Sequence, residues 1–332
     1  MIGQREGSTV VLGKDAIVLH EQSGFGRATK NTLTLAPEEA LYLVHRNKIE
    51  VNHEDFTSLL NSFSAEKGFM RRFLVYRDIR ERGYVIQPGP HDFRVFRRGE
   101  KPGKGRSQYM IRVLSERDLV DFTGIVNDVG TTGHMRKQYV IAVVDDEDEI
   151  TYYEVKTDAL KPAGPVISCP PIEARVFGST VLTLQGDAFP EGGWIGTPLD
   201  KTRLLLSPME AHYLQERDLL VFHPDAAAGE AFFRRASAED PELPEKGATY
   251  SHMRDLGYIP RTAYKFGHHF RVYSGGKKHS ELLVHAIASG VALPMSVISR
   301  SVRLAHSVRK KMLFACVDQK NIEFIEFARI KL

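Results

Sequence analysis

The chain contains two copies of one sequence pattern, and this duplication limits its possible folds more than any other feature. Residues 135–145 (MRKQYVIAVVD) resemble residues 308–318 (VRKKMLFACVD), so Lys137 corresponds to Lys310, 173 positions later in a chain of 332 residues. Three further pairs of segments match in the same order: 34–43 with 205–214, 77–84 with 253–258, and 93–96 with 270–273. Four matched segments in one order indicate an internal tandem duplication.

The two copies differ at positions that carry reactive groups. The corresponding residues of the first and second copy are Phe96 and Tyr273, Arg106 and His279, and Gly130 and Arg303. The second copy therefore holds a phenol, an imidazole, an ammonium and a guanidinium, where the first copy keeps only the ammonium of Lys137. This asymmetry predicts one chemical site per chain, with the first copy kept for architecture.

Composition indicates a soluble globular protein of two domains. Hydrophobic residues make up 42% of the chain and charged residues 26%, and 332 residues are enough for two ordinary cores. No apolar run approaches the ~20 residues needed to span a bilayer, and residues 1–7 lack the apolar core of a signal peptide. Two cysteines, Cys169 and Cys316, cannot build a disulfide framework. We therefore expect a cytoplasmic protein with no membrane partner.

Charge is distributed unevenly along the chain. The net charge is +3, but residues 261–332 contain 13 Lys/Arg and 4 Asp/Glu, a net charge of +9, so residues 1–260 carry −6. A basic segment of this size indicates a polyanionic partner such as a nucleic acid. The alternative that remains open is a solvated charged surface.

A segment rich in proline and glycine divides the copies. Residues 161–171 contain Pro162, Gly164, Pro165, Pro170 and Pro171, a composition that disfavours both helix and central strand. We therefore predict a first repeat over 1–160, a linker over 161–171 and a second repeat over 172–332. The second repeat divides into subdomains 172–248 and 249–332. Each copy is expected to consist of two small α+β units.

Local patterns predict the following elements. Pro37 and Pro208 are typical of the first turn of a helix, and Gly83 and Gly257 are typical of helix ends. Helices are therefore expected after these prolines and before these glycines, and an exposed loop is expected at 237–244. Farther along the second copy we expect a strand at 270–273, a turn at 274–276 and a helix at 280–288. A strand or helix at 299–308 should then lead to strands at 312–317 and 322–330, joined by a turn at 318–321.

Tyr273, His279 and Lys310 together could perform acid–base chemistry without a metal. A nearby cation lowers the pKa of a tyrosine from its usual ~10, so that the phenol can accept a proton. A histidine can give a proton to a leaving group near neutral pH, and a lysine can neutralise charge on a phosphoryl oxygen. Such a set suits attack of an RNA 2′-hydroxyl on the adjacent phosphorus. The alternative is three ordinary residues of a strand, a helix start and the surface.

Several segments of the second copy resemble the archaeal tRNA-splicing endonucleases. They are, in order, 265–267 (KFG), 270–273 (FRVY), 279–281 (HSE) and 299–311 (SRSVRLAHSVRKK). The duplication is similar to the homodimeric type of this family, in which each subunit fuses a degenerate repeat to a catalytic one. The resemblance implies a mixed α+β fold with two small subdomains per repeat, the second of them restriction-endonuclease-like.

The resemblance also implies a reaction. Enzymes of this family cut bulge–helix–bulge RNA in precursor tRNA at both exon–intron junctions, without a metal or other cofactor, and leave 2′,3′-cyclic phosphate and 5′-hydroxyl ends. By resemblance Tyr273 is the general base, His279 the general acid and Lys310 the group that stabilises the transition state. Lys310 is chosen over Lys311 because it corresponds to Lys137. The loop between Tyr273 and His279 is shorter than is usual in the family.

Two arginines and an acidic turn complete the implied site. Arg303 and Arg329 match positions that hold a bulged base between two guanidinium planes, as RNA sites favour; Arg329 as a simple surface residue of the last strand stays open. The acidic turn consists of Asp145, Asp146, Glu147, Asp148 and Glu149. In the family such a loop docks into a basic pocket of the partner subunit, which implies a homodimer.

Two other functions remain open. Asp145 or Asp146 followed by Glu154 and Lys156 has the arrangement of a metal-dependent, restriction-type nuclease. The chain could also be a non-catalytic RNA-binding subunit. The histidines His268, His269, His285 and His306 lack zinc-ligand spacing. His268 and His269 are expected at the surface, and the alternative that they line the site stays open.

Overall fold

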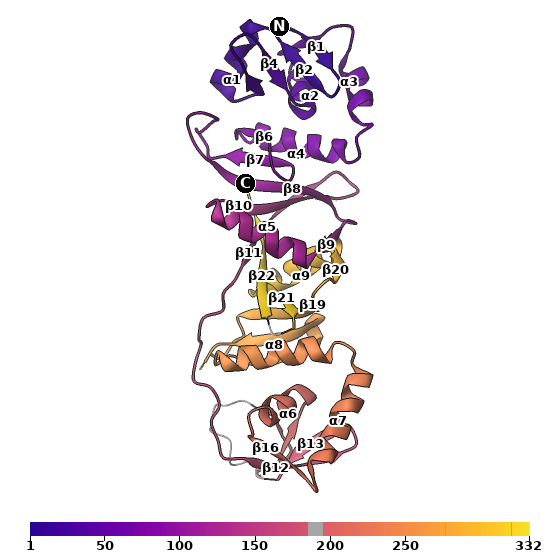
Figure 1. Cartoon of the computed structure of the whole chain (residues 1–332), viewed down its shortest axis with the longest axis vertical. Coiled ribbons are helices and arrows are strands. Elements are labelled where there is room, and N and C mark those ends of the chain that lie inside the picture. The colour runs from indigo at the N-terminus through magenta and orange to yellow at the C-terminus, as the bar shows by residue number, and fades with distance from the viewer. Residues whose placement is uncertain (185–194, 276, 320) are drawn as a thin grey trace.

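The computed structural model of the chain describes residues 1–184, 195–275, 277–319 and 321–332. Gly276 and Lys320, which fall in two of the expected turns, lie outside the described residues. The molecule is elongated, with the amino-terminal part of the first repeat at one end and that of the second repeat at the other (Figure 1). The chain returns to the middle, where the C-terminus lies. No helix among the described residues is long and apolar enough to cross a membrane.

The first repeat consists of an amino-terminal subdomain and a larger carboxy-terminal part, which contributes half of the strands of the central sheet. The amino-terminal elements are β1 (Ile2–Glu6), β2 (Thr9–Leu12), the 3-10 helix η1 (Lys14–Ala16), α1 (Ile17–Ser23), β3 (Arg27–Ala28), β4 (Leu33–Leu35), α2 (Pro37–His45), β5 (Glu50–Val51) and α3 (Phe56–Phe63). The following elements are α4 (Phe69–Glu81), β6 (Ile86–Pro88), β7 (Phe93–Phe96), β8 (Ser107–Ser115), β9 (Leu119–Asp121), α5 (Phe122–His134), β10 (Gln138–Val144) and β11 (Ile150–Thr157).

The second repeat begins at Ile172, after residues 158–171, which form no helix or strand. Its amino-terminal elements are β12 (Ile172–Phe177), β13 (Thr180–Thr183), β14 (Thr197–Pro198), β15 (Leu204–Leu206), α6 (Pro208–Gln215), β16 (Leu220–His223) and α7 (Ala226–Glu239). The remaining elements are α8 (Leu243–Asp255), β17 (Ile259–Ala263), the 3-10 helix η3 (Tyr264–Phe266), β18 (His268–Tyr273), β19 (Leu282–Ala288), β20 (Ala292–Pro294), α9 (Met295–Ser307), β21 (Lys311–Asp318) and β22 (Asn321–Ile330).

The duplication is confirmed at the level of single contacts. Helices α4 and α8 have 13 residues each, as do α5 and α9. In α4 the guanidinium of Arg80 donates to the hydroxyl of Tyr76 at 2.9 Å, and in α8 that of Arg254 donates to Tyr250 at 3.0 Å. The amino-terminal sheets also have the same strand order, β3-β4-β2-β1-β5 and β14-β15-β13-β12-β16. Both copies therefore form the same mixed α+β fold, as predicted.

The carboxy-terminal parts of the two repeats share one sheet. Its ten strands follow the order β17-β18-β19-β21-β22-β11-β10-β8-β7-β6, so the halves are mirrored about the β22–β11 junction. There the strands pair antiparallel from Tyr152 opposite Ile330 to Thr157 opposite Ile325. The last strand thus pairs across the repeats of one chain. This pairing covers an edge that each half would otherwise expose.

Helices cover both faces of the shared sheet. Alternate residues of β10 belong to different cores: Val140 and Ala142 pack in the core of the first repeat, whereas Tyr139 and Ile141 pack under α5 and α9. This alternation is the period of two that a strand imposes on its side chains. The core under α5 and α9 joins the repeats, since Phe122 of α5 lies 5.1 Å from the ring of Phe314 in β21.

One predicted element is wrong and a second is shorter than predicted. The expected helix at 280–288 is instead strand β19 from Leu282 to Ala288, because β19 is a central strand between β18 and β21 and is buried on both faces. Its nearly continuous apolar run can be mistaken for a buried helix. The loop expected at 237–244 is confined to residues 240–242, since α7 continues to Glu239 and α8 begins at Leu243. Residues 299–308, left open between strand and helix, fall largely in helix α9.

The helix starts at the two prolines are confirmed. Helices α2 and α6 begin at Pro37 and Pro208. In α6 the carboxylate of Glu210, two residues after Pro208, accepts from the backbone N–H of Ser207 at 2.9 Å and from that of Gly196 at 2.8 Å. This buried carboxylate therefore caps the helix and ties it to the sheet.

Candidate active site

Strand register confirms which residues of the two repeats correspond. The pair Pro260 and Val272 in β17–β18 matches the pair Ile86 and Val95 in β6–β7, so the next residue, Tyr273, takes the place of Phe96. The phenol is half-buried, whereas the Phe96 ring is 4% exposed.

The same comparison places His279. Leu282 pairs with Lys311 in β19–β21, as Tyr109 pairs with Gln138 in β8–β10. Counting back three residues from Leu282 and from Tyr109 leads to His279 and Arg106. The sequence correspondence between the copies therefore holds in the folded chain.

Tyr273 and Lys310 lie near one end of the sheet. Val272 pairs with Leu282, and Leu282 pairs with Lys311. Extending both registers by one residue puts Tyr273, Glu281 and Lys310 in one row across β18, β19 and β21. Neighbouring strands are about 4.8 Å apart, so the Cα atoms of Tyr273 and Lys310 are about 10 Å apart.

His279 and Lys310 line a single depression of about 830 Å³. The Nζ of Lys310 donates to the backbone carbonyl of Ser280, the residue after His279, at 2.6 Å. The other lining residues include five basic ones, Lys161, Lys277, Lys278, Arg309 and Lys311, against two acidic ones, Asp158 and Glu281. The exposed His279 and the ammonium of Lys310 thus share one depression, whereas Tyr273 is not among the residues that line it.

The short loop that carries His279 is held at both ends by one carboxylate. Glu281 accepts from the hydroxyl of Ser274 at 2.6 Å and from the Nζ of Lys277 at 2.5 Å. Both hydrogen bonds lower the pKa of Glu281, and the one from Lys277 has the larger effect. Glu281 therefore connects the end of β18 to the start of β19 around the loop.

The two neighbouring lysines have different roles in the fold. The Nζ of Lys311 lies 3.4 Å from the buried carboxylate of Glu326 and 3.6 Å from that of Asp158. Lys310 instead bonds the backbone beside His279. Lys311 is thus held in ion pairs, and Lys310 is the lysine whose ammonium binds the backbone next to His279.

Arg303 and Arg329 lie together, but in a different depression. This second depression, of about 550 Å³, has on its wall Arg300, Arg303, His306 and Arg329 together with Asp145 and Glu149 of the first repeat. Both Arg303 and Arg329 are exposed. The structure thus brings the two predicted RNA-binding arginines together beside the acidic turn of their own chain, and it does not bring them into the depression of His279 and Lys310.

The five acidic residues of the turn between β10 and β11 are not equivalent. Asp145 shapes the turn, since its carboxylate accepts from the backbone N–H of Glu147 at 3.0 Å and of Glu149 at 2.9 Å. Asp146 forms an ion pair with Arg117. Glu147 and Asp148 are exposed and lie outside the arginine depression, so their carboxylates are the ones best placed to meet another molecule.

The residues of the metal-nuclease alternative lie far apart. Glu154 pairs with Val140 across β10–β11, and Asp145 is five residues farther along that strand. At about 3.4 Å per residue the two positions are about 17 Å apart, too far to share an ion. Glu154 accepts from Gln138 at 2.6 Å, and Lys156 lies 3.4 Å from Glu326. Within the ranges that the structure describes, no group of three or more His, Cys, Asp or Glu could hold a metal.

A cluster of histidines lies inside the second repeat, and the expectation that His268 and His269 are surface residues is wrong. The rings of His269 and His285 stack at 4.0 Å, and His268 lies 5.6 Å from His285. His268 is 8% exposed. Nδ1 of His269 accepts from the backbone N–H of Ala286 at 3.0 Å. The sequence indicated this cluster only through the two adjacent histidines of a predicted strand. Whether their rings are buried depends on which helices cover the strand.

Acid should destabilise the fold through this cluster. Burial lowers the pKa of His268, His269 and His285 to about 4, from a usual value of about 6.5. The unfolded chain therefore takes up protons first, and stability should be lost as the pH falls from about 6.5 to about 4. Urea unfolding followed by circular dichroism at several pH values should show this loss. The loss of stability should be smaller than in the parent protein for His285→Gln, and equal to that of the parent for His134→Gln, which lies at an exposed helix end. Equal losses in the two variants would contradict the assignment of the acid effect to the histidine cluster.

Comparison with known proteins assigns the family. The catalytic C-terminal domain of the tRNA intron endonucleases matches residues 69–152 and again 243–324, and their N-terminal domain matches residues 1–59. The two matches to the catalytic domain fall on corresponding parts of the repeats, and the second of them contains Tyr273, His279 and Lys310.

Similar proteins extend over almost the whole chain. A tRNA-splicing endonuclease of Methanococcoides burtonii is 37% identical, with 97% of each chain covered. Those of Methanosarcina acetivorans and Halobacterium salinarum are 36% and 32% identical, with 99% of each chain covered. The duplicated fold, the matched domains and these relatives together show that the chain belongs to the tRNA intron endonuclease family.

Proposed function

We propose that the chain is a tRNA-splicing endonuclease that cuts bulge–helix–bulge RNA at both exon–intron junctions and leaves 2′,3′-cyclic phosphate and 5′-hydroxyl ends. The observation that carries the proposal is the asymmetry between two copies of one fold. Only the second copy has a phenol, an imidazole and an ammonium at one end of the sheet. The first repeat, residues 1–160, would serve as architecture, and the repeat over 172–332 would hold the chemistry.

Each of the three groups has a distinct role in this proposal. Tyr273 takes the proton from the 2′-hydroxyl as its oxygen attacks phosphorus, so that a P–O2′ bond forms while the P–O5′ bond breaks. His279 gives a proton to the departing 5′-oxygen. Lys310, whose Nζ bonds the carbonyl beside His279, stabilises the charge that builds on the phosphoryl oxygens. The product ends then follow from the bonds exchanged.

These three groups supply proton transfer and charge neutralisation without a metal. We therefore expect the purified chain to cut a bulge–helix–bulge RNA at two places in excess chelator, with rates unchanged when Mg²⁺ is added. Gel analysis of end-labelled RNA would measure this. Cleavage lost in chelator and restored by Mg²⁺ would contradict the proposed chemistry. Absence of cleavage by the purified chain under both conditions would favour a non-catalytic RNA-binding subunit.

The placement of the arginines supports a homodimer. Arg303 and Arg329 line a different depression from His279 and Lys310. If a bulged base is held by the arginines while the adjacent phosphate meets the acid–base set, two chains can complete one RNA site. The exposed Glu147 and Asp148 of one chain and the basic residues 261–332 of the other provide complementary charge for such a contact.

A further inference from the structure

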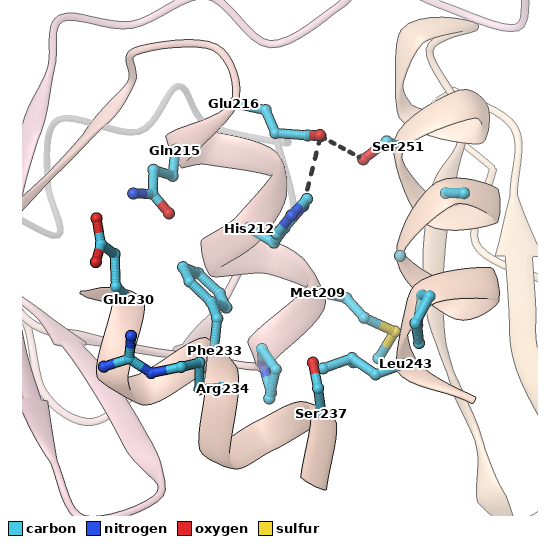
Figure 2. Close-up of a pocket in the computed structure, with 14 residues that line it drawn as sticks. Met209, His212, Gln215, Glu216, Glu230, Phe233, Arg234, Ser237, Leu243 and Ser251 are labelled. Atoms are coloured by element: carbon cyan, nitrogen blue, oxygen red, sulfur yellow. Dashed lines mark hydrogen bonds and ion pairs between the residues drawn. The ribbon is translucent and has the colours of Figure 1, made fainter. Parts of the chain in front are cut away.

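The second repeat has an open groove between helices α6, α7 and α8 (Figure 2). Its volume is about 870 Å³. Much of the wall is apolar: Pro208, Met209, Phe233, Leu243, Pro244 and Ala248. At one end the carboxylate of Glu216 accepts from the hydroxyl of Ser251 at 3.2 Å and lies 3.5 Å from Nδ1 of His212. Glu230 and Arg234 of α7 are also part of the lining. None of these residues belongs to the proposed catalytic set.

The corresponding region of the first repeat is filled. Helices α2 and α6 match from Pro37 and Pro208, and α4 and α8 match from Phe69 and Leu243. Leu41 then corresponds to His212, and Phe73 to Gly247. Leu41 is fully buried and Phe73 is 2% exposed. Where the first repeat has the buried ring of Phe73, the second repeat thus has Gly247, which has no side chain and lines the groove.

In the first repeat a helix fills this region. The ring of Phe56 in α3 lies 6.5 Å from Phe73, and that of Phe63, at the end of α3, lies 5.5 Å from Phe69. Leu59 of α3 is fully buried in the same core. Together with Leu60, these apolar residues of α3 follow the spacing i, i+3, i+4, i+7. Helices that bind in grooves have this spacing.

Helix α7, which follows β16 as α3 follows β5, packs differently. It lies against β12 and β16 and also contacts α6 and α8, with the ring of Phe233 5.4 Å from that of His212. Its approach to β16 is close, since a Cβ added at Gly229 would lie 2.5 Å from the Phe222 ring. By contrast, a Cβ added at Gly247 would meet nothing within 4 Å. The space above Gly247 is therefore open.

We propose that this groove binds an amphipathic helix of a partner protein, with apolar residues at i, i+3, i+4 and i+7 and a basic polar face. The apolar pattern is that of α3, which occupies the same place in the first repeat. The basic face follows from charge: residues 172–248 contain 13 Asp/Glu and 7 Lys/Arg, a net charge of −6. A negative subdomain disfavours RNA and attracts a cationic helix. The proposal goes beyond the cleavage activity and does not depend on it.

A peptide with the apolar face of α3 can probe the groove of the full chain. The probe would contain residues 55–64, extended by Ala and Lys to about 15 residues so that a helix can form, with its exposed positions changed to lysine: Thr57→Lys, Ser58→Lys, Asn61→Lys and Ser62→Lys. Met209 lines the groove, so its ¹³C-labelled methyl group, assigned through Met209→Leu, reports binding by NMR. We expect a saturable shift of this resonance.

Variants at Gly247 test whether the groove itself is the binding site. Gly247→Phe restores the ring of the first repeat and should weaken peptide binding at least tenfold, whereas Gly247→Ala should retain binding. Both proteins should cleave RNA as the parent does and unfold at a temperature no lower, because the added atoms enter open space and both alanine and phenylalanine favour a helix interior more than glycine does. A peptide with Phe56→Ala and Phe63→Ala should bind at least tenfold more weakly than the probe.

Several results would overturn the proposal. They are no shift of the Met209 methyl at millimolar peptide, equal binding by Gly247→Phe, or equal binding of a peptide with glutamates in place of the lysines. Displacement of the peptide by single-stranded RNA would assign the groove to nucleic acid instead. Self-association of the chain that Gly247→Phe abolishes would assign it to a second copy.

Discussion

Replacing His279 by alanine should slow RNA cleavage by about 10²–10⁴-fold, because a positioned general acid typically contributes that factor. RNA affinity should change little, since the surrounding basic residues of the depression remain. Tyr273→Phe, which introduces the residue found at this position in the first repeat, should lower the cleavage rate by a factor in the same range. Single-turnover cleavage at saturating enzyme measures the chemical step, and filter binding measures affinity.

The first repeat offers matched controls for these variants. Arg106→Ala and Lys137→Ala change the counterparts of His279 and Lys310, and both should cleave at the parent rate. Lys137 contacts the sulfur of Met110 at 3.9 Å rather than the backbone beside an imidazole. If Lys137→Ala were as damaging as Lys310→Ala, the assignment of chemistry to the second repeat alone would be wrong.

Removing charge from the exposed part of the acidic turn should weaken the dimer and lower cleavage together. The double variant Glu147→Gln, Asp148→Asn leaves the Asp145 hydrogen bonds and the Asp146–Arg117 ion pair in place, so the turn should keep its shape. Loss of one partner of a buried interfacial charge pair can cost ~2–5 kcal/mol. We therefore expect dimer dissociation to become at least tenfold more favourable in sedimentation velocity, with slower cleavage at protein concentrations near the new dissociation constant.

The corresponding turn of the second repeat provides the control. Asp318 occupies the place of Asp145, and Asp318→Asn should leave both dimerisation and cleavage unchanged. Raising the protein concentration should restore cleavage by the double variant, because neither substituted residue takes part in proton transfer. A parent protein that sediments as a monomer at micromolar concentration while it cleaves normally would rule out the dimer.

The duplication made much of the fold predictable from the sequence. Matching Lys137 with Lys310 and Phe96 with Tyr273 placed residues correctly because each copy conserves its strand register, and one register fixes every side chain on its strand. Helix starts at Pro37 and Pro208 were predictable because proline and capping signals act within a few residues.

The features that depend on distant packing could not be predicted. The apolar run of β19 favours a helix in the sequence because burial on both faces hides the strand period. Pairing of β11 with β22, which fuses the repeats into one sheet, involves segments with no local signal for each other. The histidine cluster and the groove at Gly247 depend on which helices cover which strands. The separation of Arg303 and Arg329 from His279 is likewise a property of the assembled sheet.

A bulge–helix–bulge RNA with a single 2′-deoxy nucleotide on the 5′ side of one junction tests internal transesterification most directly. The purified chain, in excess chelator, should fail to cut at the substituted junction, because the attacking hydroxyl is absent, and should still cut the other junction to a 2′,3′-cyclic phosphate end. Cleavage at the 2′-deoxy junction at the rate of the unmodified RNA would show that water, rather than the 2′-hydroxyl, is the nucleophile, and would contradict the roles assigned to Tyr273, His279 and Lys310.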